Sequence, residues 1–261
     1  MPGEKEEYLP KQTSIKLKNQ DHFIFGAWPI VEALKEGKEF NKILLQKGNK
    51  SETTAQIVAL CKERAIPVQY VPVQKLNGLT RKNHQGVVAF VSPIEYQTIE
   101  SVLPLLYEEG KEPFILVLDR ITDVRNFGAI CRTAEGAGVD AIIIPTKDAA
   151  QINADAIKTS AGAVFNIPIC RETSLISSVY YLKESGLQIV GCTEKGAQDF
   201  RTVKLDGPSA LIMGSEENGI DDKILGLCDY KAVIPMKGKT ESLNVSVACG
   251  ILLYHLEQFK A

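Results

Sequence analysis

Residues 114–136, FILVLDRITDVRNFGAICRTAEG, join a continuous apolar run to a polar loop and then to a helix-like pattern. The run 114–118 is typical of a strand buried on both faces of a parallel sheet, and 126–138 has helical spacing. Further apolar strands are expected at 141–145, 187–192, 210–213 and 232–235, with a long helix at 243–259. Strands that alternate with helices predict an α/β domain over residues 113–261, built on a mainly parallel sheet covered on both faces.

A smaller α/β unit is expected before this domain. Strands are predicted at 42–46, 66–71 and 85–91, and helices near Ile30 and over 53–64. This unit spans residues 21–96, and residues 97–112 form a linker with room for a short helix. Residues 1–20 are polar and mixed in charge, as expected of a flexible tail.

Composition excludes several classes of protein. The chain has 261 residues, of which 44% are hydrophobic and 24% charged, as in ordinary globular proteins and unlike disordered or fibrous chains. No apolar run approaches the ~20 residues that span a bilayer, and the N-terminus lacks the apolar core of a signal peptide. A cytoplasmic protein without membrane contact is therefore expected.

The six cysteines form no CxxC pair and only three histidines accompany them, so we predict buried thiols and no metal site.

Charge is unevenly spread along the chain. Residues 1–96 hold 14 Lys and Arg against 10 Asp and Glu, whereas residues 97–261 hold 16 against 22. The overall net charge of −2 therefore hides a basic first part and an acidic second part. The difference suggests two domains with different partners, although ordinary scatter of surface charge explains it equally well. Because phosphate affinity depends on local basic patches, the net charge does not exclude RNA binding.

Three nucleotide-site or hydrolase motifs fail on context. Residues 136–141, GAGVDA, match a loose dinucleotide fingerprint but follow a helix and precede a strand, the reverse of the required order. Residues 238–240, GKT, resemble the end of a P-loop, yet Val233 stands where that loop needs glycine. Ser215 lacks the spacing of a hydrolase nucleophile elbow.

Three polar, glycine- and amide-rich stretches each begin at the end of an expected strand. They cover residues 119–135, 211–220 and 234–248. Ligands of parallel α/β sheets bind at the carboxyl ends of the strands. The three stretches are therefore predicted to build one site.

Together these stretches resemble the three signature motifs of the SpoU (TrmH-like) RNA ribose 2′-O-methyltransferases of the SPOUT superfamily, over residues 113–261. The N-terminal unit resembles the substrate-binding domain often joined to this family, on FG at 25–26, VEAL at 31–34 and NHQGVVA at 83–89. The arrangement is most similar to the subgroup that methylates a guanosine of 23S ribosomal RNA. The resemblance implies a deep trefoil knot, S-adenosylmethionine (SAM) as methyl donor, and a homodimer with active sites at the interface.

The resemblance assigns one set of residues to the cofactor. It places Gly214, Ile234 and Leu243 around SAM, largely through backbone groups, with Met213, Ser246 and Thr193 as second-rank candidates. A glycine at position 214 would let a ligand approach the backbone closely, although a glycine here would also suit an ordinary turn.

The resemblance assigns a second set to catalysis. Arg132 is the implied catalytic arginine, although a helical arginine is commonly just solvated. Because its pKa is too high for an ordinary base, we expect it to hold a phosphate and stabilise the developing alkoxide. Asn126, Glu216, Ser242 and Asn244 are implied to position Arg132 and the ribose. From residue type alone, Asn126 and Ser242 would equally suit helix N-caps and Glu216 a surface carboxylate.

The sequence departs from the family pattern at Val124 and Arg125, where many relatives carry proline and a small residue. This departure concerns the local loop geometry and RNA contacts, and not the reaction.

RNA contacts are predicted in the N-terminal unit at Arg81, Lys82, Asn83 and His84. A basic, polar loop of this kind suits phosphates and an unstacked base, although it also suits an exposed turn. Lys16 and Lys18 are further candidates. The predicted function is thus SAM-dependent 2′-O-methylation of large-subunit ribosomal RNA. A transfer RNA nucleotide is the alternative substrate, and a non-catalytic RNA-binding module is the alternative of another class.

Overall fold

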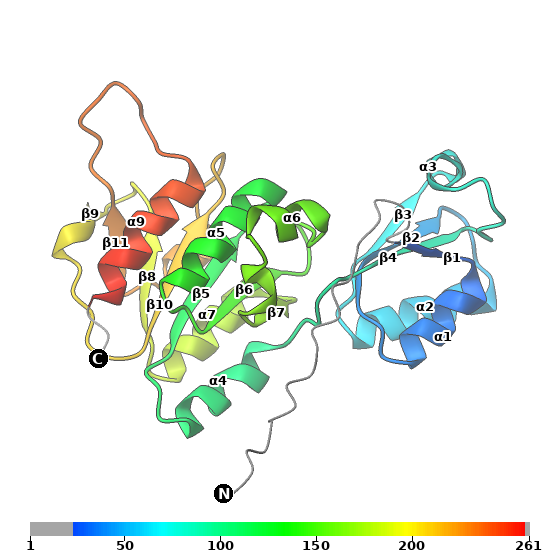
Figure 1. Ribbon diagram of the computed structural model, residues 1–261, viewed down its shortest axis with the longest axis horizontal. Coiled ribbons are helices and arrows are strands. Elements are labelled where there is room, and N and C mark those ends of the chain that lie inside the picture. The colour runs from blue at the N-terminus through cyan, green and yellow to red at the C-terminus, as the bar shows by residue number, and fades with distance from the viewer. Residues whose placement is uncertain (1–22, 259–261) are drawn as a thin grey trace, which may run out of the picture.

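The computed structural model describes residues 23–258, which form two α/β domains joined by a short connection (Figure 1). The predicted flexible tail over residues 1–20, including Lys16 and Lys18, lies outside the described residues.

The N-terminal domain is built on a four-stranded sheet in the order β1-β4-β2-β3. Its strands are β1 (Phe23–Phe25), β2 (Phe40–Gln46), β3 (Val68–Val71) and β4 (Val87–Val91). β4 runs antiparallel to both of its neighbours, whereas β2 and β3 are parallel. Helices α1 (Ala27–Lys35) and α2 (Glu52–Glu63) cover one face, and the short α3 (Val73–Leu79) lies on the other (Figure 1).

The predicted linker is largely folded. Residues 97–112 contribute α4 (Ile99–Glu108), whose buried side chains Ile99, Val102 and Leu103 belong to the core of the second domain. Thr98 and Ser101 form a capping box at its start, which fixes where the helix begins. The connection between the domains is therefore shorter than the sequence pattern indicates.

The C-terminal domain is built on seven parallel strands in the order β7-β6-β5-β10-β8-β11-β9, which confirms the predicted sheet type. The strands are β5 (Phe114–Asp119), β6 (Ala141–Pro145), β7 (Ile169–Glu172), β8 (Gln188–Cys192), β9 (Gln198–Asp199), β10 (Ser209–Gly214) and β11 (Tyr230–Val233). One face is packed by α5 (Val124–Gly136), α6 (Ala154–Thr159) and α9 (Val245–Glu257). The other is packed by α4, α7 (Leu175–Glu184) and α8 (Asp222–Leu225). Single 3₁₀ turns occur at Ala163–Phe165 and Phe200–Thr202. The knot stays a prediction.

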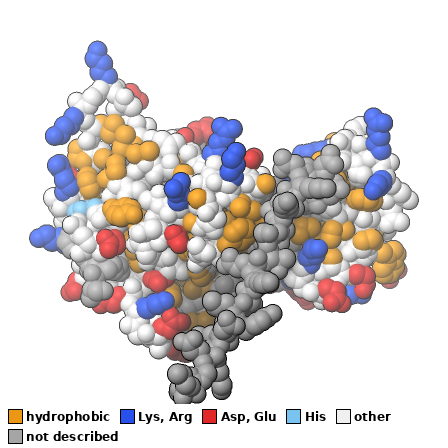
Figure 2. All heavy atoms as spheres, viewed as in Figure 1, with side chains coloured by type: hydrophobic (Ala, Val, Ile, Leu, Met, Phe, Trp, Pro, Cys, Tyr) orange, Lys and Arg blue, Asp and Glu red, His pale blue; other side chains and the backbone are white. Residues whose placement is uncertain are grey.

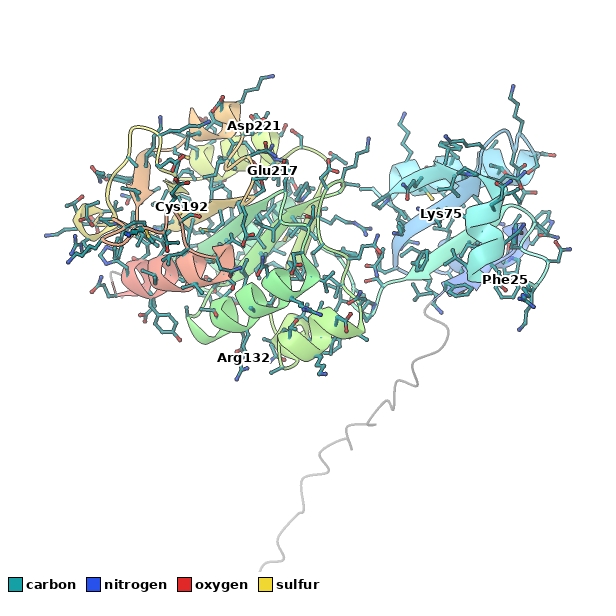
Figure 3. The ribbon with its side chains drawn as sticks, turned by 90° about the horizontal axis from the view of Figure 1, so that it is seen from above. Phe25, Lys75, Arg132, Cys192, Glu217 and Asp221 are labelled. Atoms are coloured by element: carbon teal, nitrogen blue, oxygen red, sulfur yellow. The ribbon has the colours of Figure 1, made fainter. Side chains whose placement is uncertain are left out.

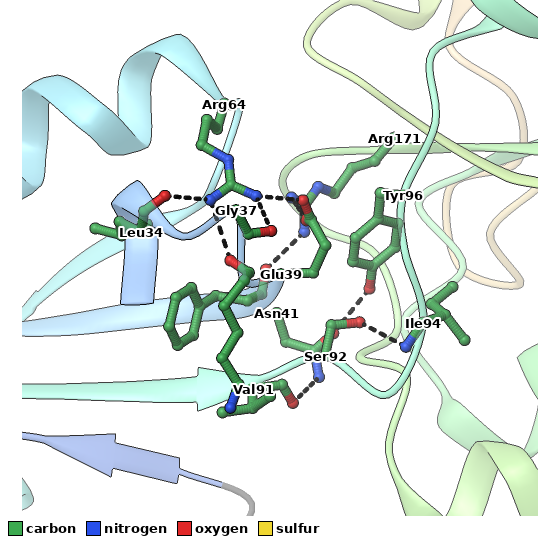
Figure 4. Close-up of polar contacts among 12 residues, drawn as sticks. Leu34, Gly37, Glu39, Asn41, Arg64, Val91, Ser92, Ile94, Tyr96 and Arg171 are labelled. Carbon is green, nitrogen blue, oxygen red and sulfur yellow. Dashed lines mark hydrogen bonds and ion pairs between the residues drawn. The ribbon is translucent and has the colours of Figure 1, made fainter. Parts of the chain in front are cut away.

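Arg171 of β7 joins the two domains (Figure 4). Its side chain is only 5% exposed, and its Nη1 donates to the backbone oxygen of Phe40 at 2.8 Å. Nη2 lies 3.5 Å from Glu39, and the guanidinium stacks 3.8 Å from the centre of the Tyr96 ring. Burial lowers the pKa of Arg171, so a desolvated cation is held here by groups from the other domain and the connection.

A second polar chain runs through the same junction. The Tyr96 hydroxyl donates to Asn41 Oδ1 at 2.8 Å, and Asn41 Nδ2 donates to the backbone oxygen of Ile152 at 2.8 Å. Because Asn41 is on β2 and Ile152 is in the larger domain, these bonds also fix how the domains meet. The junction thus holds the N-terminal domain beside β7, an edge strand of the larger sheet (Figure 1).

Candidate active site

The site lies where the strand order of the larger sheet reverses direction, between β5 and β10. Asp119 and Gly214, the last residues of these strands, are paired in register. The loops after β5, β8, β10 and β11 therefore emerge side by side at the carboxyl edge, the usual ligand position in such sheets. All three polar stretches expected to converge do so.

A cavity of about 720 Å³ opens between these loops. Among its walls are five residues predicted to hold the cofactor, Thr193, Met213, Gly214, Ile234 and Leu243, and three predicted to act in catalysis, Glu216, Ser242 and Asn244. Ser246 is not part of the wall. Its hydroxyl and its backbone N–H donate to Asn244 Oδ1 at 2.6 and 3.0 Å, so Ser246 supports Asn244 instead.

A polar cluster joins the three loops. Glu216 Oε1 accepts hydrogen bonds from Asn126 Nδ2 at 3.2 Å, from Asn244 Nδ2 at 2.9 Å and from the Val245 backbone N–H at 3.2 Å. Asn244 Nδ2 also donates to Asn126 Oδ1 at 3.0 Å. A single carboxylate thus gathers residues that are 90 and 28 positions away in the chain, as expected of an arrangement built for a site.

Helix capping explains why the cluster forms here. Asp123 caps α5 by accepting from the Arg125 and Asn126 backbone N–H groups, both at 2.8 Å. Asn244 caps α9. The N-cap role considered for Asn126 and Ser242 is therefore wrong, and both helices begin two residues away from their predicted starts. Asn126 consequently lies in the first turn of α5 with its amide free to reach Glu216.

Gly214 is required by the protein's own backbone. A Cβ placed on Gly214 would lie 2.2 Å from the Gly219 carbonyl carbon and 2.3 Å from the Ile220 nitrogen. The loop after β10 folds back tightly, with Ser215 and Gly219 forming a β-bridge. Glycine is thus needed at position 214 because a side chain there would collide with this loop. The sequence suggested a different reason, the close approach of a ligand to the backbone.

No role was predicted from the sequence for Asp119 and Arg120, two residues that hold the loops of the site together. Asp119 is 4% exposed and receives both Nε and Nη2 of Arg120, each at 2.8 Å, together with the Asp221 N–H at 2.7 Å. Arg120 adopts a left-handed φ of 60°, which is strained for a residue other than glycine. Its Nη2 also donates to the Gly219 oxygen at 3.2 Å, so the ion pair ties the first loop to the second. The sequence feature that could have indicated this role is the position of Asp119, an aspartate that follows a buried apolar run.

A second cavity of about 340 Å³ adjoins the first. The two share Glu216 and neighbouring residues of the β10 loop, and Asn126 and Asp123 line only the smaller one. The polar cluster therefore stands between two cavities, as needed where two bound molecules react with each other.

Arg132 lies apart from this cluster. It is exposed on α5, and within residues 23–258 its side chain forms no ion pair or hydrogen bond. In Figure 3 it lies far from Glu217 and Asp221. Six residues of helix separate it from Asn126, which corresponds to about 9 Å along the axis and a turn of about 240°. The two side chains consequently leave different sides of one helix.

The walls of the larger cavity carry negative charge. Four carboxylates, Glu194, Glu216, Glu217 and Glu241, line it against one cation, Lys195. The wall also carries many apolar side chains, those of Met213, Ile220, Val233, Ile234, Met236, Leu243, Val245 and Ala248. Such a lining disfavours a phosphate-bearing cofactor and fits a flat, partly apolar molecule with a positive charge.

The predicted RNA-contact loop of the N-terminal domain is only partly available to a ligand. Arg81, Lys82 and Asn83 are exposed, but His84 is 8% exposed. Its Nδ1 accepts from the Gly86 N–H at 3.0 Å and its Nε2 lies 2.8 Å from Asn77 Oδ1. Because both ring nitrogens are engaged, His84 shapes the loop, and its direct contact with RNA stays a prediction.

Comparisons with known proteins agree with this geometry. The family described as SpoU rRNA methylase matches residues 113–254, and the one described as RNA 2′-O ribose methyltransferase substrate binding matches residues 23–97. A TrmH-family tRNA/rRNA methyltransferase of Bacillus subtilis is 34% identical over 240 residues, covering 92% of this chain and 96% of that protein. The chain therefore belongs to the SpoU methylase family, and the resemblance seen in the sequence is confirmed.

Two solved structures are also similar. An AdoMet-bound rRNA methyltransferase from Sinorhizobium meliloti has 27% identity and a TM-score of 0.57, covering 89% of this chain and 85% of that one. A TrmH/SpoU tRNA modifying enzyme of A. aeolicus has 32% identity and a TM-score of 0.52, covering 62% of this chain and 83% of that one.

Two further findings concern residues 23–258. None of their helices is long and apolar enough to cross a membrane. They also contain no group of three His, Cys, Asp or Glu side chains placed to hold a metal ion.

Proposed function

We propose that this protein transfers a methyl group from SAM to the ribose 2′-hydroxyl of a guanosine in 23S ribosomal RNA. The observation that carries the proposal is the Asn126–Glu216–Asn244 cluster, which stands between a cavity suited to a cationic cofactor and a smaller polar cavity. Bound SAM supplies an electrophilic methyl on a positively charged sulfur. The carboxylate-lined wall complements that charge, and the apolar residues suit the adenine ring.

The chain's own residues orient the acceptor. Glu216 Oε1 accepts hydrogen bonds from three donors, whereas Oε2 accepts none from residues 23–258. We assign Oε2 to a ribose hydroxyl in the smaller cavity, because a carboxylate held by two amides gives that hydroxyl one fixed direction. When SAM is bound, the 2′-oxygen would form its bond to the methyl carbon as the C–S bond breaks and the neutral thioether S-adenosylhomocysteine leaves, and the hydroxyl proton would pass to Glu216 Oε2, so positioning contributes much of the rate.

Arg132 completes the site from a second copy of the chain. Its own cluster is out of its reach along α5, and α9, which packs beside α5, presents Val247, Ile251 and Tyr254 to solvent at 51%, 36% and 56% exposure. Spacings of four and three residues place these on one helix face, typical of helix packing against a partner. In a homodimer built on this face, Arg132 would hold the phosphate beside the ribose and stabilise charge developing on the 2′-oxygen.

Mixing two inactive variants tests the role of the second copy. Arg132→Ala and Glu216→Ala should each abolish methyl transfer. After the two are unfolded and refolded together, heterodimers regain one intact site each, so about one quarter of wild-type activity is expected for a symmetric dimer. No recovered activity from a verified heterodimer would place Arg132 in the site of its own chain.

Ribosomal RNA is favoured by the extent of the likeness. The rRNA methyltransferase structure covers both domains of this chain, whereas the tRNA modifying enzyme covers 62% of it. Incubation with ribosomal RNA, transfer RNA and labelled SAM tests the assignment. Label at an alkali-resistant guanosine of 23S RNA is expected. Label only in transfer RNA would redirect the assignment to the alternative substrate, and no label in any RNA would leave a binding module.

A further inference from the structure

The face of the N-terminal sheet that carries α3 displays three phenylalanines. Phe23 and Phe25 of β1 and Phe90 of β4 form what we call the aromatic platform. The ring centres of Phe23 and Phe90 are 6.0 Å apart and those of Phe23 and Phe25 are 6.3 Å apart. The rings pack on a small cluster that includes Leu44 and Leu76, but all three stay partly exposed. α3 therefore covers this face incompletely.

Lysines surround the aromatic platform. Lys42 Nζ lies 5.1 Å from the centre of the Phe90 ring, and Lys82 Nζ lies 5.7 Å from that of Phe25. Burial and the nearby Lys75 lower the pKa of Lys42. Within residues 23–258, none of these three lysines forms an ion pair. Lys42 and Lys75 repel each other beside partly exposed rings, and an anion would relieve that repulsion.

Charge differs between the two sides of the domain. In Figure 2, Lys and Arg side chains are prominent on the upper side of the smaller lobe, where α3 lies in Figure 1, while Asp and Glu gather lower down. The helices α1 and α2 mix carboxylates with Lys35 and Lys62, whereas residues 73–84, which include α3, hold Lys75, Arg81 and Lys82 and no carboxylate. Figure 3 shows Phe25 and Lys75 in this smaller domain. An anionic partner is therefore directed to the α3 side.

We propose that a single-stranded segment of the RNA substrate lies across the aromatic platform, with bases stacked on its rings and phosphates against Lys42, Lys75 and Lys82. Aromatic rings with interleaved cations are the recurring means by which proteins bind unpaired RNA. Each lysine leaves its ring for a phosphate, and a base takes its place. The exchange is favourable because base stacking on an aromatic ring exceeds an exposed cation–π contact. The inference rests on the proposed RNA methyl transfer and adds an unpaired stretch next to the methylated nucleotide to the features of the substrate.

Two variants separate stacking from charge in the full-length protein. Phe25→Leu removes a ring but keeps an apolar side chain, and the double variant Lys42→Gln/Lys82→Gln removes two charges. The matched controls are Tyr70→Leu, whose partner across the strands is Leu45 of the α1–α2 face, and Lys62→Gln on α2. Circular dichroism confirms that each variant is folded.

Fluorescence anisotropy with a labelled, unstructured 12-nucleotide RNA measures the effect. Phe25→Leu should weaken binding about tenfold without changing its salt dependence. The double lysine variant should lower the slope of log K against log salt by about 1.4, since each phosphate contact on a single strand contributes about 0.7. The controls should bind as the wild type does. Ultraviolet cross-linking should join the RNA to peptides containing β1 or β4.

Methyl transfer distinguishes failure of this inference from failure of the proposed function. If wild-type protein methylates RNA but the variants keep its KM and its oligonucleotide affinity, the inference is overturned. The face then belongs to another occupant, such as the chain's own residues 1–22, which lead directly into β1, or a protein. If the oligonucleotide binds in a Phe25-dependent way and no RNA is ever methylated, RNA binding by the aromatic platform is supported and the proposed function is overturned.

Discussion

Replacing Arg171 by methionine should uncouple the two domains while leaving both cores intact. Methionine keeps the length of the side chain and a contact with Tyr96, but it removes the guanidinium. The lost interactions are the hydrogen bond to the Phe40 oxygen at 2.8 Å, the Glu39 contact at 3.5 Å and the stacking at 3.8 Å from the Tyr96 ring centre. All of these link β7 of the larger domain to residues before it, so neither hydrophobic core is touched.

The expected magnitude follows from these contacts. A hydrogen bond from a charged donor contributes about 1.5–3 kcal/mol, and a desolvated cation–π contact about 2 kcal/mol. Part of this lost free energy is offset, because the variant no longer buries a cation. Desolvation lowers the pKa of that guanidinium, and its Nε has no hydrogen-bond partner. Glu39 keeps its ion pair with Arg64 at 2.5 Å, so no carboxylate is stranded. We expect a net loss of about 2 kcal/mol from the coupling between the domains.

The single tryptophan of the chain makes the assay specific to one domain. Trp28 lies in α1, so its fluorescence reports the N-terminal domain, whereas far-ultraviolet circular dichroism reports mainly the larger one. In urea the wild type should give coincident curves. In Arg171→Met the fluorescence transition should move about 1–2 M lower than the dichroism transition, given an m-value of about 1–2 kcal/mol/M for a small domain.

Activity supplies an independent readout of the same variant. Because the N-terminal domain would no longer be held in a fixed position beside the larger domain, the KM for RNA should rise while the Kd for SAM stays at its wild-type value. Arg201→Met, which removes a solvent-exposed ion pair with Asp199, is the control and should change neither curve nor KM. Coincident transitions at the wild-type midpoint, with an unchanged KM, would refute the assignment of Arg171 as the interdomain joint.

Three further predictions concern the active site. Glu216→Gln keeps the shape of the carboxylate but loses its charge, so kcat should fall about tenfold or more while the melting temperature, followed by dichroism, stays close to wild type; an unchanged kcat would remove Glu216 from the mechanism. Gly214→Ala should cost about 3 kcal/mol of unfolding free energy, because the new Cβ would meet Gly219 at 2.2 Å; chemical denaturation measures this, and a wild-type midpoint would show that the loop moves freely. Burial raises the pKa of the Cys192 thiol in the cavity wall to about 11, so its alkylation by iodoacetamide, followed by mass spectrometry, should be slow at neutral pH, accelerate as pH rises toward 11 and be suppressed by SAM. Fast labelling at pH 7 would contradict the burial.

Sequence patterns recovered the elements whose hydrophobicity is local and strong. The strand predicted at 141–145 matches β6, and the one at 114–118 falls one residue short of β5, because an uninterrupted apolar run has few alternatives. β7 escaped prediction because half of its four residues, Arg171 and Glu172, are charged and yet buried. β1 has three residues, too few to show a period.

The sequence by itself determined the class of fold, the order of the three polar loops and the edge of the sheet where they meet, because strand polarity sends every loop after a parallel strand to the same side. Tertiary structure alone decided which atoms act. Glu216 contacts Asn126 and Asn244 only because β5 and β10 are neighbours, a pairing of residues far apart in the chain. It also placed Arg132 away from this cluster, and it gave Gly214, which lines the cavity, a second role as space for the protein's own loop. These outcomes depend on non-local packing, which no window of sequence contains.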